Sequence, residues 1–408
     1  MDIEMSMPAP MAPASEAELV TLIRAAAEAK RGLVTEGGGT KRHLGPSAPA
    51  GTERVSLRAL NRVVAYEPGD MVVCVEAGIR LADLQQVLAV HRQWLPVDPP
   101  FAASTLGGVL ATHSSGPRRL AYGTIKDMLL GARVVGAAGQ ASKSGGRVVK
   151  NVSGYDLHKL QVGAFGSLGV IVEANFRVTA LPEASAILWL ATPSLAGCHE
   201  TLLDVASSSL RPCALEAFDL SSSHALAEAV ADFPSGASLA LIGIEGSHPI
   251  VARHRRDLAV FRTGAQASGW LEGPAVERVW GALRDLPARH TSDITLRVAA
   301  RPHDLPRLLG ELQPLRARLT GTAVQAALGI ARISVAAPDD VPALAAELSK
   351  WQSLAKASAG YAVVESAPVD CADRACLAWT APVDHSLGAR LKQRWDPDQI
   401  LNPGKMVC

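Results

Sequence analysis

The feature that most constrains the fold of this chain is a set of four segments, rich in glycine and other small residues, in its first half. They lie at residues 37–40, 104–108, 113–117 and 163–169. Each segment taken alone is typical of a plain turn. Four of them in order favour a bound dinucleotide, because loops without side chains let backbone N–H groups converge on a pyrophosphate.

The order of strands and glycines excludes a Rossmann domain. That fold places its Gly-x-Gly-x-x-Gly segment after a strand and at the start of a helix. Here Gly163, Gly166 and Gly169 lead directly into a strand expected at residues 170–173. We therefore expect a dinucleotide-binding fold of another kind.

Local patterns around these segments predict a mixed α+β domain. Ser15 and Glu18 form a capping box at the start of an amphipathic helix. Two runs of β-branched and apolar residues, 62–67 and 71–76, flank a Pro-Gly-Asp turn and predict a β-hairpin. Further strands are expected at residues 32–36, 128–135, 140–144 and 169–181.

The length of 408 residues predicts two domains, since a single domain usually holds about 50–250 residues. The glycine segments all fall in the first of them. We expect a disordered lead-in at 1–14, a first α+β domain at 15–182, a smaller α+β cap domain at 183–355, and a C-terminal segment at 356–408 that returns to the first domain.

Charge and hydropathy narrow the classes of partner. Forty basic and 39 acidic residues give a formal net charge of +1, which supplies no basic surface for nucleic acid. The first 14 residues lack the features of a secretory signal, and no stretch of about 20 apolar residues could span a membrane. These patterns predict a cytoplasmic protein, with any membrane association through partner subunits.

The six cysteines give no metal-binding pattern. Only Cys371 and Cys376 are close in sequence, and no further thiolates or histidines follow them at short intervals. We interpret the cysteines as reduced structural thiols and expect neither a metal site nor an iron–sulfur cluster on this chain.

Taken together, the four glycine segments resemble the flavin domain of the vanillyl-alcohol oxidase superfamily, also called the PCMH-type FAD-binding domain. In that family a Gly-Gly-Thr-type loop cradles the pyrophosphate, a Thr-x-Gly-Gly segment covers it, and a Gly-x-x-Gly-x-x-Gly segment followed by Val or Ile reaches the adenosine. The resemblance covers residues 15–182 and implies FAD as the cofactor. It assigns to the cofactor Gly37, Gly38, Gly39, Thr40, Ser104, Thr105, Gly107, Gly108, Ser114, Ser115, Gly116, Gly166, Gly169, Val170 and Ile171.

The same resemblance predicts how the FAD is held. Members that tether the flavin covalently use a histidine at the third position of the first loop, where this chain has Gly39. His43 lies four residues later and is interpreted as an ordinary loop histidine. We therefore expect non-covalent FAD.

Two further stretches, 145–160 and 396–405, resemble the glycolate oxidase D and E subunits, and the E subunit in particular. This resemblance implies an FAD-binding subunit of a complex that oxidises glycolate, a 2-hydroxy acid, to glyoxylate. The implied partners are a second FAD-binding subunit and an iron–sulfur subunit that receives the electrons. Lys150 in the first stretch is either a solvated charge or a cation that stabilises the reduced flavin.

Two alternatives remain open. The chain is a flavin-carrying structural or electron-relay subunit without its own turnover, or a stand-alone FAD-dependent oxidase of another hydroxy acid or alcohol. Related 2-hydroxyacid dehydrogenases, including the D subunit, carry paired histidines in their cap, and this sequence has no such motif. The scattered cap histidines are interpreted as surface residues: His199, His224, His248, His254, His290 and His303.

Oxidation of a hydroxy acid at a flavin requires a base for the hydroxyl proton and a cation for the carboxylate. Three cap residues are weak candidates for catalytic roles: Glu216, Arg297 and Arg332. Each could face the flavin or form a surface ion pair instead.

Overall fold

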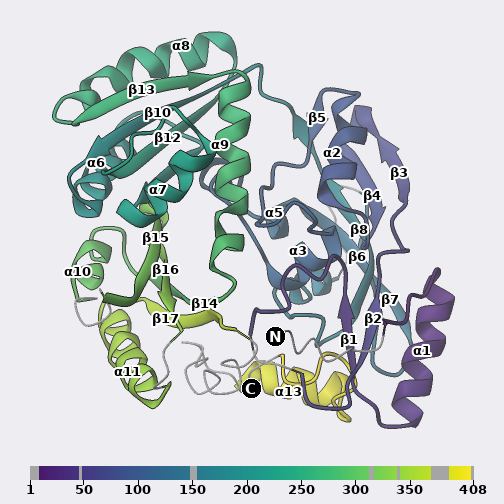
Figure 1. Cartoon of the computed structure of the whole chain (residues 1–408). Helices are drawn as coiled ribbons and strands as arrows, with labels where there is room; N and C mark the ends of the chain where they lie inside the picture. The colour runs from purple at the N-terminus through teal and green to yellow at the C-terminus, as the bar shows by residue number, and fades with distance from the viewer. Residues whose placement is uncertain are drawn as a thin grey trace.

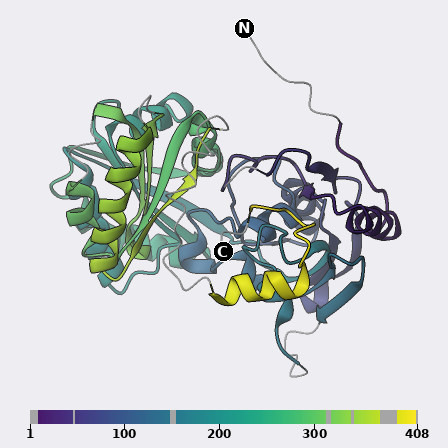
Figure 2. The same ribbon diagram turned by 90° about the horizontal axis from the view of Figure 1, so that it is seen from below.

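A computed structural model describes residues 9–45, 48–147, 154–311, 317–337, 341–368 and 386–405 of the chain. These residues form two lobes that lie side by side (Figures 1 and 2). The lobe coloured purple to blue is the N-terminal half, and the teal to green lobe is the cap. The helix coloured yellow, near the C-terminus, lies along the N-terminal lobe (Figure 2).

An antiparallel sheet forms the centre of the N-terminal lobe, with strand order β3-β4-β8-β6-β7. The predicted hairpin is confirmed as β3 and β4, joined by a 3₁₀ turn over Pro68–Asp70. The strand predicted at 169–181 is divided, and its last part pairs in a separate ribbon instead. The strands are β3 (Val63–Glu67), β4 (Val72–Glu76), β5 (Gln93–Trp94), β6 (Leu129–Val135), β7 (Ala141–Gly145), β8 (Val170–Arg177) and β9 (Thr179–Ala180).

A second small layer packs beside this sheet. The capping box is confirmed at α1 (Glu16–Glu28), where the Ser15 side chain accepts a hydrogen bond from the Glu18 amide. Parallel strands β1 (Leu33–Glu36) and β2 (Glu53–Ser56) lie against the buried face of α1. In the described part of the predicted lead-in, Met11 forms a parallel bridge with Val55, so this residue pairs with β2.

Short helices connect the strands of the N-terminal lobe. They are α2 (Leu81–Ala89), α3 (Leu106–Thr112), α4 (Arg119–Tyr122), α5 (Ile125–Met128) and a 3₁₀ turn at Leu157–Leu160. The helix α3 begins at the second glycine segment, and its buried residues Leu106, Val109 and Leu110 pack into the core of the lobe.

The cap is built on an antiparallel sheet that, in the described residues, has eight strands in the order β13-β10-β12-β11-β15-β16-β14-β17. Its last strand ends at Ser366, later than the boundary expected at 355. The strands are β10 (Ala184–Thr192), β11 (Ala214–Phe218), β12 (Ser238–Gly246), β13 (Ala267–Glu272), β14 (Asp293–Ala299), β15 (Leu319–Gln325), β16 (Ile330–Ala336) and β17 (Tyr361–Ser366).

Helices cover the cap sheet. The 30-residue apolar cluster of the cap combines alternate strand residues such as Leu296 and Ile333 with helix residues such as Leu202 and Trp351. The helices are α6 (Leu195–Ser207), α7 (Leu220–Ala229), α8 (His248–Asp257), α9 (Pro274–Asp285), α10 (Leu305–Gly310) and α11 (Val341–Ala357), with 3₁₀ turns at Leu258–Arg262, Leu286–His290 and Ala326–Leu328. No helix within the described ranges is long and apolar enough to cross a membrane.

The C-terminal segment packs against the N-terminal lobe. After α13 (Ser386–Trp395), Leu401 forms a parallel bridge with Leu33. The ammonium of Lys392 is buried, where it pairs with Asp396 and donates to the carbonyl oxygens of Ser167 and Leu401, each at 2.8 Å. This pairing fixes the last described residues beside the glycine segments. Cys371, Cys376 and Lys150, which the sequence singled out, lie outside the described residues.

Candidate cofactor and substrate site

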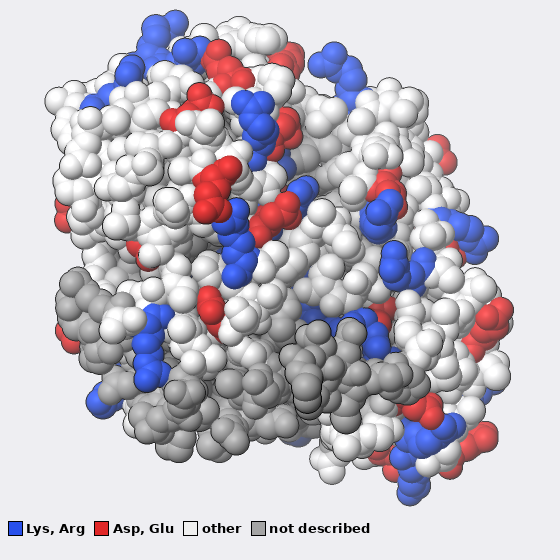
Figure 3. Space-filling view, in the orientation of Figure 1, with Lys and Arg blue, Asp and Glu red and all other residues white. Residues whose placement is uncertain are grey.

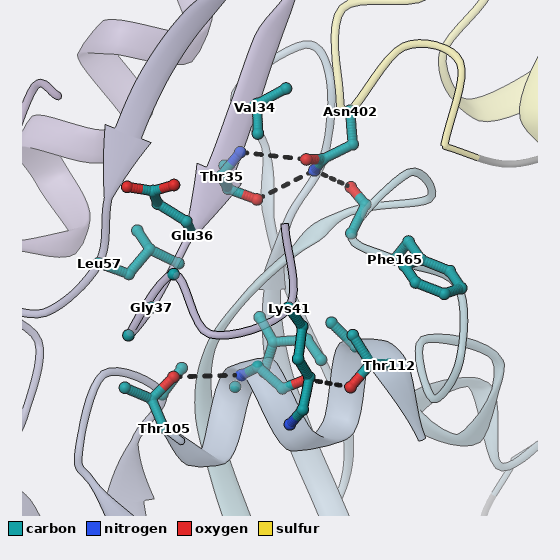
Figure 4. A pocket seen from close by; sticks show the side chains of 18 of the residues that line it. Val34, Thr35, Glu36, Gly37, Lys41, Leu57, Thr105, Thr112, Phe165 and Asn402 are labelled. Carbon is teal, nitrogen blue, oxygen red and sulfur yellow. Dashed lines mark hydrogen bonds between the residues drawn. The ribbon is translucent and has the colours of Figure 1, made fainter. Parts of the chain in front are cut away.

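Three of the four glycine segments meet at a cavity of about 900 Å³ that is open to solvent. Its walls come from β1 and the first loop, the start of α3, the Gly166 loop and the C-terminal segment (Figure 4). Ten of the residues assigned to the cofactor line it: Gly37, Gly38, Gly39, Thr40, Thr105, Gly107, Gly108, Gly166, Val170 and Ile171.

The first loop has the properties expected of a pyrophosphate cradle. Among the described residues, no backbone acceptor pairs with the amides of Gly37, Gly38, Gly39 or Thr40. Gly37 and Gly38 are required by packing as well. A Cβ at Gly37 would lie 1.9 Å from Thr105 Oγ1, and a Cβ at Gly38 would lie 2.2 Å from the carbonyl oxygen of Ala103.

The second glycine segment does not leave its amides free for a ligand, although this was expected of all four segments. The amide of Leu106 donates to Ile79, that of Gly107 donates to Ala77, and that of Gly108 donates to Thr105 Oγ1 at 3.3 Å. A Cβ at Gly107 would lie 2.8 Å from the Cβ of Ala77. Glycine is present here mainly because α3 begins in close contact with the segment after β4.

Five assigned residues lie outside this first cavity. Ser114 and Ser115 line a second cavity instead. Ser104, Gly116 and Gly169 line neither cavity. A Cβ at Gly116 would meet the Asp98 carbonyl at 2.0 Å, and one at Gly169 would meet the Val134 side chain at 2.4 Å. These two glycines therefore allow close packing, and the proposed contact of these five residues with the cofactor stays a prediction.

Asn402 is a cavity residue that the sequence did not single out. Its side-chain oxygen accepts from the Thr35 amide at 3.1 Å, and its nitrogen donates to Thr35 Oγ1 and to the Gly166 carbonyl oxygen at 3.0 and 3.1 Å (Figure 4). One side chain thus joins β1 to the fourth glycine loop. The Asn-Pro-Gly-Lys stretch at 402–405 was the signal available in the sequence.

A second cavity, of about 1410 Å³ when the open solvent at its mouth is included, lies between the N-terminal lobe and the cap. Lys41, Thr112 and Phe165 line both cavities, so the two adjoin. The cap contributes alternate residues of three adjacent strands, because side chains two apart on a strand share a face. These residues are Thr295 and Arg297 of β14, Ile330 and Arg332 of β16, and Tyr361, Val363 and Glu365 of β17.

The structure brings two of the three weak candidates, Arg297 and Arg332, to this second cavity. Both interact with Glu365: Arg332 Nε lies 2.8 Å and Arg297 Nη1 3.9 Å from its carboxylate. Burial alone would raise the pKa of Glu365, but the charges of Arg332 and Arg297 outweigh it and hold that pKa below its usual value. Arg297 also stacks over Tyr361, with its guanidinium 5.3 Å from the ring centre. Glu365 therefore neutralises part of the charge of both arginines.

Arg119 of α4 faces the same cavity and was missed by the sequence reasoning. Within the described residues its guanidinium forms no hydrogen bond or ion pair. Burial lowers its pKa, and repulsion from Arg332 and Arg297 lowers it further. Arg119 is thus a cation that an anionic ligand in this cavity could neutralise.

Two histidines from distant parts of the N-terminal lobe also line the second cavity. Burial lowers the pKa of His43 and of His113, so both imidazoles are neutral near pH 7 and can accept a proton. His113 Nε2 lies 3.1 Å from Thr124 Oγ1, and the ring of His43 packs edge-on against Phe101. His43 is therefore a cavity residue and not only part of a loop.

Glu216, the third weak candidate, lines neither cavity. It is buried on β11, where its carboxyl oxygen accepts from Gln325 Nε2 at 3.2 Å. Burial raises its pKa to about 8, which keeps it protonated at neutral pH. The same Gln325 nitrogen lies 3.4 Å from the Gly116 carbonyl oxygen, so Glu216 belongs to the contact between the cap and the third glycine segment.

The prediction that the cap histidines are surface residues is wrong for His199. Its side chain is buried on α6, and its Nε2 lies 2.8 Å from the carbonyl oxygen of Pro302. His199 lies on the buried face of α6, together with Cys198 and Leu202, and this face packs against the sheet. It lies in neither cavity.

Comparison with known protein families gives matches in both halves of the chain. The family described as "FAD binding domain" matches residues 8–145, and the family described as "FAD linked oxidases, C-terminal domain" matches residues 181–313. FAD is thus the cofactor, and the open amides of the first loop beside the 900 Å³ cavity fit its pyrophosphate.

Curated relatives cover different parts of the chain. Glycolate oxidase subunit GlcE of Escherichia coli is 36% identical over 41% of this chain, and D-2-hydroxyglutarate dehydrogenase of Xanthomonas citri pv. viticola is 28% identical over 74%. The matches span 48% of the length of the first relative and 66% of the second. An uncharacterized FAD-linked oxidoreductase of Mycobacterium tuberculosis is 26% identical, with 96% of this chain and 89% of that protein covered.

Solved structures with the same fold include two of alkyldihydroxyacetonephosphate synthase. They superpose with TM-scores of 0.67 and 0.69 at 21% and 20% identity. The superpositions cover 96% of this chain and about three quarters of the synthase chain. At this identity the likeness extends to the fold alone, which confirms the predicted mixed α+β architecture.

Proposed function

Because this chain belongs to the FAD-linked oxidases with a PCMH-type FAD-binding domain, we propose that it is the FAD-binding subunit of a glycolate oxidase or dehydrogenase complex. In this proposal it is an FAD-dependent oxidoreductase that acts on the CH–OH group of a 2-hydroxy acid, with glycolate oxidised to glyoxylate. Its partners in the complex are a second FAD-binding subunit and an iron–sulfur subunit, and the iron–sulfur subunit receives the electrons. The complex is placed in the cytoplasm, with any membrane contact made by the partner subunits.

The observation that carries this proposal is the pair of adjoining cavities. One is lined by the glycine loops, and the other presents arginines and neutral histidines. A 2-hydroxy acid is an anion with an ionisable hydroxyl group, so its oxidation requires both kinds of side chain. The names of the relatives, a glycolate oxidase subunit and a 2-hydroxyglutarate dehydrogenase, point to the same substrate class.

The residues of the second cavity supply the two groups that this oxidation requires, a cation for the carboxylate and a base for the hydroxyl proton. Arg119, which has no carboxylate partner among the described residues, binds the substrate carboxylate, while Glu365 holds Arg297 and Arg332 in place beside it. The imidazole of His113 or His43 accepts the hydroxyl proton, and the Thr124 hydroxyl orients the ring of His113. Bound FAD supplies the acceptor for the hydride.

Anaerobic mixing tests this function. The FAD-loaded chain is mixed with excess glycolate and, separately, with D-lactate. The visible absorbance band of the flavin is followed in each case. Bleaching of the isolated chain by glycolate is the expected result. The control is the His113→Gln, His43→Gln double variant, which should bind FAD but be reduced about 10²–10⁴-fold more slowly, the usual contribution of a positioned base.

A second candidate is an electron-relay or structural subunit, and the absence of a paired-histidine motif in the cap sequence favours it. In that case the isolated chain is not bleached by glycolate, but its flavin is reduced after the partner subunits are added. Bleaching by another alcohol or hydroxy acid, with no response to glycolate alone or in the assembly, would instead indicate a stand-alone oxidase.

A further inference from the structure

Lys41 directly follows the first glycine loop and lies where the two cavities adjoin. It is one of three residues that line both of them. Figure 4 shows its side chain extending from the loop over α3, the helix that carries Thr105 and Thr112 at its two ends. No role for this lysine was expected from the sequence.

The ammonium of Lys41 has few partners in the described part of the chain. Its Nζ lies 3.3 Å from Ser104 Oγ, and Ser104 in turn donates its own proton to the Pro100 carbonyl oxygen at 2.7 Å. The Ser104 oxygen therefore presents a lone pair to Lys41. An ammonium has three N–H groups, so two of them have no acceptor among these residues.

Lys392, a lysine of the same lobe that is more fully buried than the half-buried Lys41, has its charge fully compensated. It pairs with the Asp396 carboxylate and donates to two carbonyl oxygens. No carboxylate of the described residues takes that position beside Lys41, and its burial accordingly lowers its pKa to about 7. A cation held in this way is stabilised when an anion binds next to it.

We propose that Lys41 is the counter-charge of an anionic group of bound FAD and positions the cofactor at the junction of the two cavities. The group is either the pyrophosphate, which is charged in both redox states, or the ring of the reduced flavin, which gains negative charge only on reduction. The substrate carboxylate is a weaker fit for two reasons. The second cavity already contains three other cations, Arg119, Arg297 and Arg332. Lys41 also directly follows the first loop, whose amides have no backbone acceptor among the described residues. This inference depends on FAD binding and not on the proposed substrate.

Two measurements on the full chain test this inference without any turnover. One is the Kd of the apoprotein for oxidised FAD, and the other is the midpoint potential of the bound flavin. Both are made for Lys41→Met and Lys41→Gln, which remove the charge, and for Lys41→Arg, which keeps it. The matched control is Lys143→Met, a change to an exposed lysine of β7 in the same lobe.

If Lys41 pairs with the pyrophosphate, both neutral variants bind oxidised FAD about 10- to 100-fold more weakly, as expected for loss of a charge-assisted hydrogen bond, and the midpoint potential is unchanged. If it pairs with the reduced ring, the affinity for oxidised FAD is kept and the midpoint potential falls. A tenfold loss of stabilisation of the reduced state corresponds to about 30 mV for this two-electron couple. Lys41→Arg recovers most of either effect.

The proposal is overturned if the neutral variants match Lys143→Met in both FAD affinity and midpoint potential. It is also overturned if Lys41→Arg is as defective as Lys41→Met, because volume and not charge would then be the cause. Thermal unfolding of the apoproteins separates these outcomes from misfolding, since removal of a half-buried cation that has no carboxylate partner should not lower the Tm.

Discussion

Two adjacent arginines, Arg118 and Arg119, have opposite environments. Arg118 forms ion pairs with Asp98 and Glu245, each at 3.3 Å, and its guanidinium lies 4.6 Å and 5.2 Å from the ring centres of Trp94 and Trp280. Arg119 faces the second cavity and has no carboxylate partner among the described residues. The first arginine is neutralised by the protein, and the second is available to a ligand.

The partners of Arg118 come from both lobes. Asp98 and Trp94 belong to the N-terminal lobe, whereas Glu245 of β12 and Trp280 of α9 belong to the cap. Burial alone would lower the pKa of Arg118, but the two carboxylates outweigh it and raise that pKa. Arg118 thus fixes how the cap sits on the N-terminal lobe, and this placement brings Arg297 and Arg332 to face Arg119.

The outer surface of the molecule shows no comparable separation of charge. In the space-filling view of Figure 3, basic and acidic side chains are interspersed over the visible face. This agrees with the formal net charge of +1. Lys41 and Arg119, which have no ion pair with a carboxylate among the described residues, lie in the cavities, where an anion can reach them.

The largest effect is expected from Arg118→Met. This change leaves the buried carboxylates of Asp98 and Glu245 without their cation, which typically costs about 3–5 kcal/mol of folding stability. Arg119→Met is the matched control, because it removes the neighbouring arginine by the same substitution and should change stability by less than about 0.5 kcal/mol. Equal denaturant midpoints for the two variants would contradict the distinction between them.

Glu216 extends the comparison to a buried carboxyl group that forms no ion pair with an arginine in the described part of the chain. Its pKa of about 8 in the folded state exceeds the ordinary value of 4.5, so ionisation of the unfolded chain lowers stability as pH rises from about 4.5 to 8. Glu216→Gln, which cannot ionise, should therefore be more stable than the natural protein by roughly 3 kcal/mol at pH 7. The difference should vanish below about pH 4.5.

Unfolding by urea at about pH 4, 6 and 8 measures the difference in stability between Glu216→Gln and the natural protein. A Glu216→Gln variant that is less stable at every pH would show that Glu216 is ionised and paired in the folded state. The hydrogen bond from Gln325 would then be the main interaction lost.

The smallest effect is expected from Arg119→Met, and it concerns binding and not folding. Loss of its charge-assisted hydrogen bond should weaken binding of a 2-hydroxy acid about 10- to 100-fold, with FAD binding unchanged. Equilibrium titration with glycolate or the unreactive dianion oxalate, followed through the flavin spectrum, measures the Kd. An unchanged Kd for Arg119→Met, together with a raised Kd for Arg297→Met, would move the carboxylate to the cap arginine.

Local patterns predicted the elements that depend on neighbours in sequence. The capping box at Ser15 and the hairpin around Pro68–Asp70 were confirmed, because cap geometry and turn chemistry act over three or four residues. Ten of the residues that the family resemblance assigned to the cofactor line the first cavity. The sequence could not show that Leu106 and Gly107 donate their amides to Ile79 and Ala77, since these acceptors lie on another segment of the chain.

The sequence by itself indicated a dinucleotide-binding domain from its glycine segments, and the resemblance of those segments to a known flavin domain implied FAD, with a cap to follow. Only the tertiary structure decided which charges are available. Arg118 and Arg119 differ in their partners, and Lys41 and Lys392 differ in the same way. Those partners are separated by up to 225 residues along the chain, as for Lys392 and Ser167. Whether the protein neutralises a charged side chain or leaves it available to a ligand depends on the groups around it in space. The order of residues in the sequence does not contain that information.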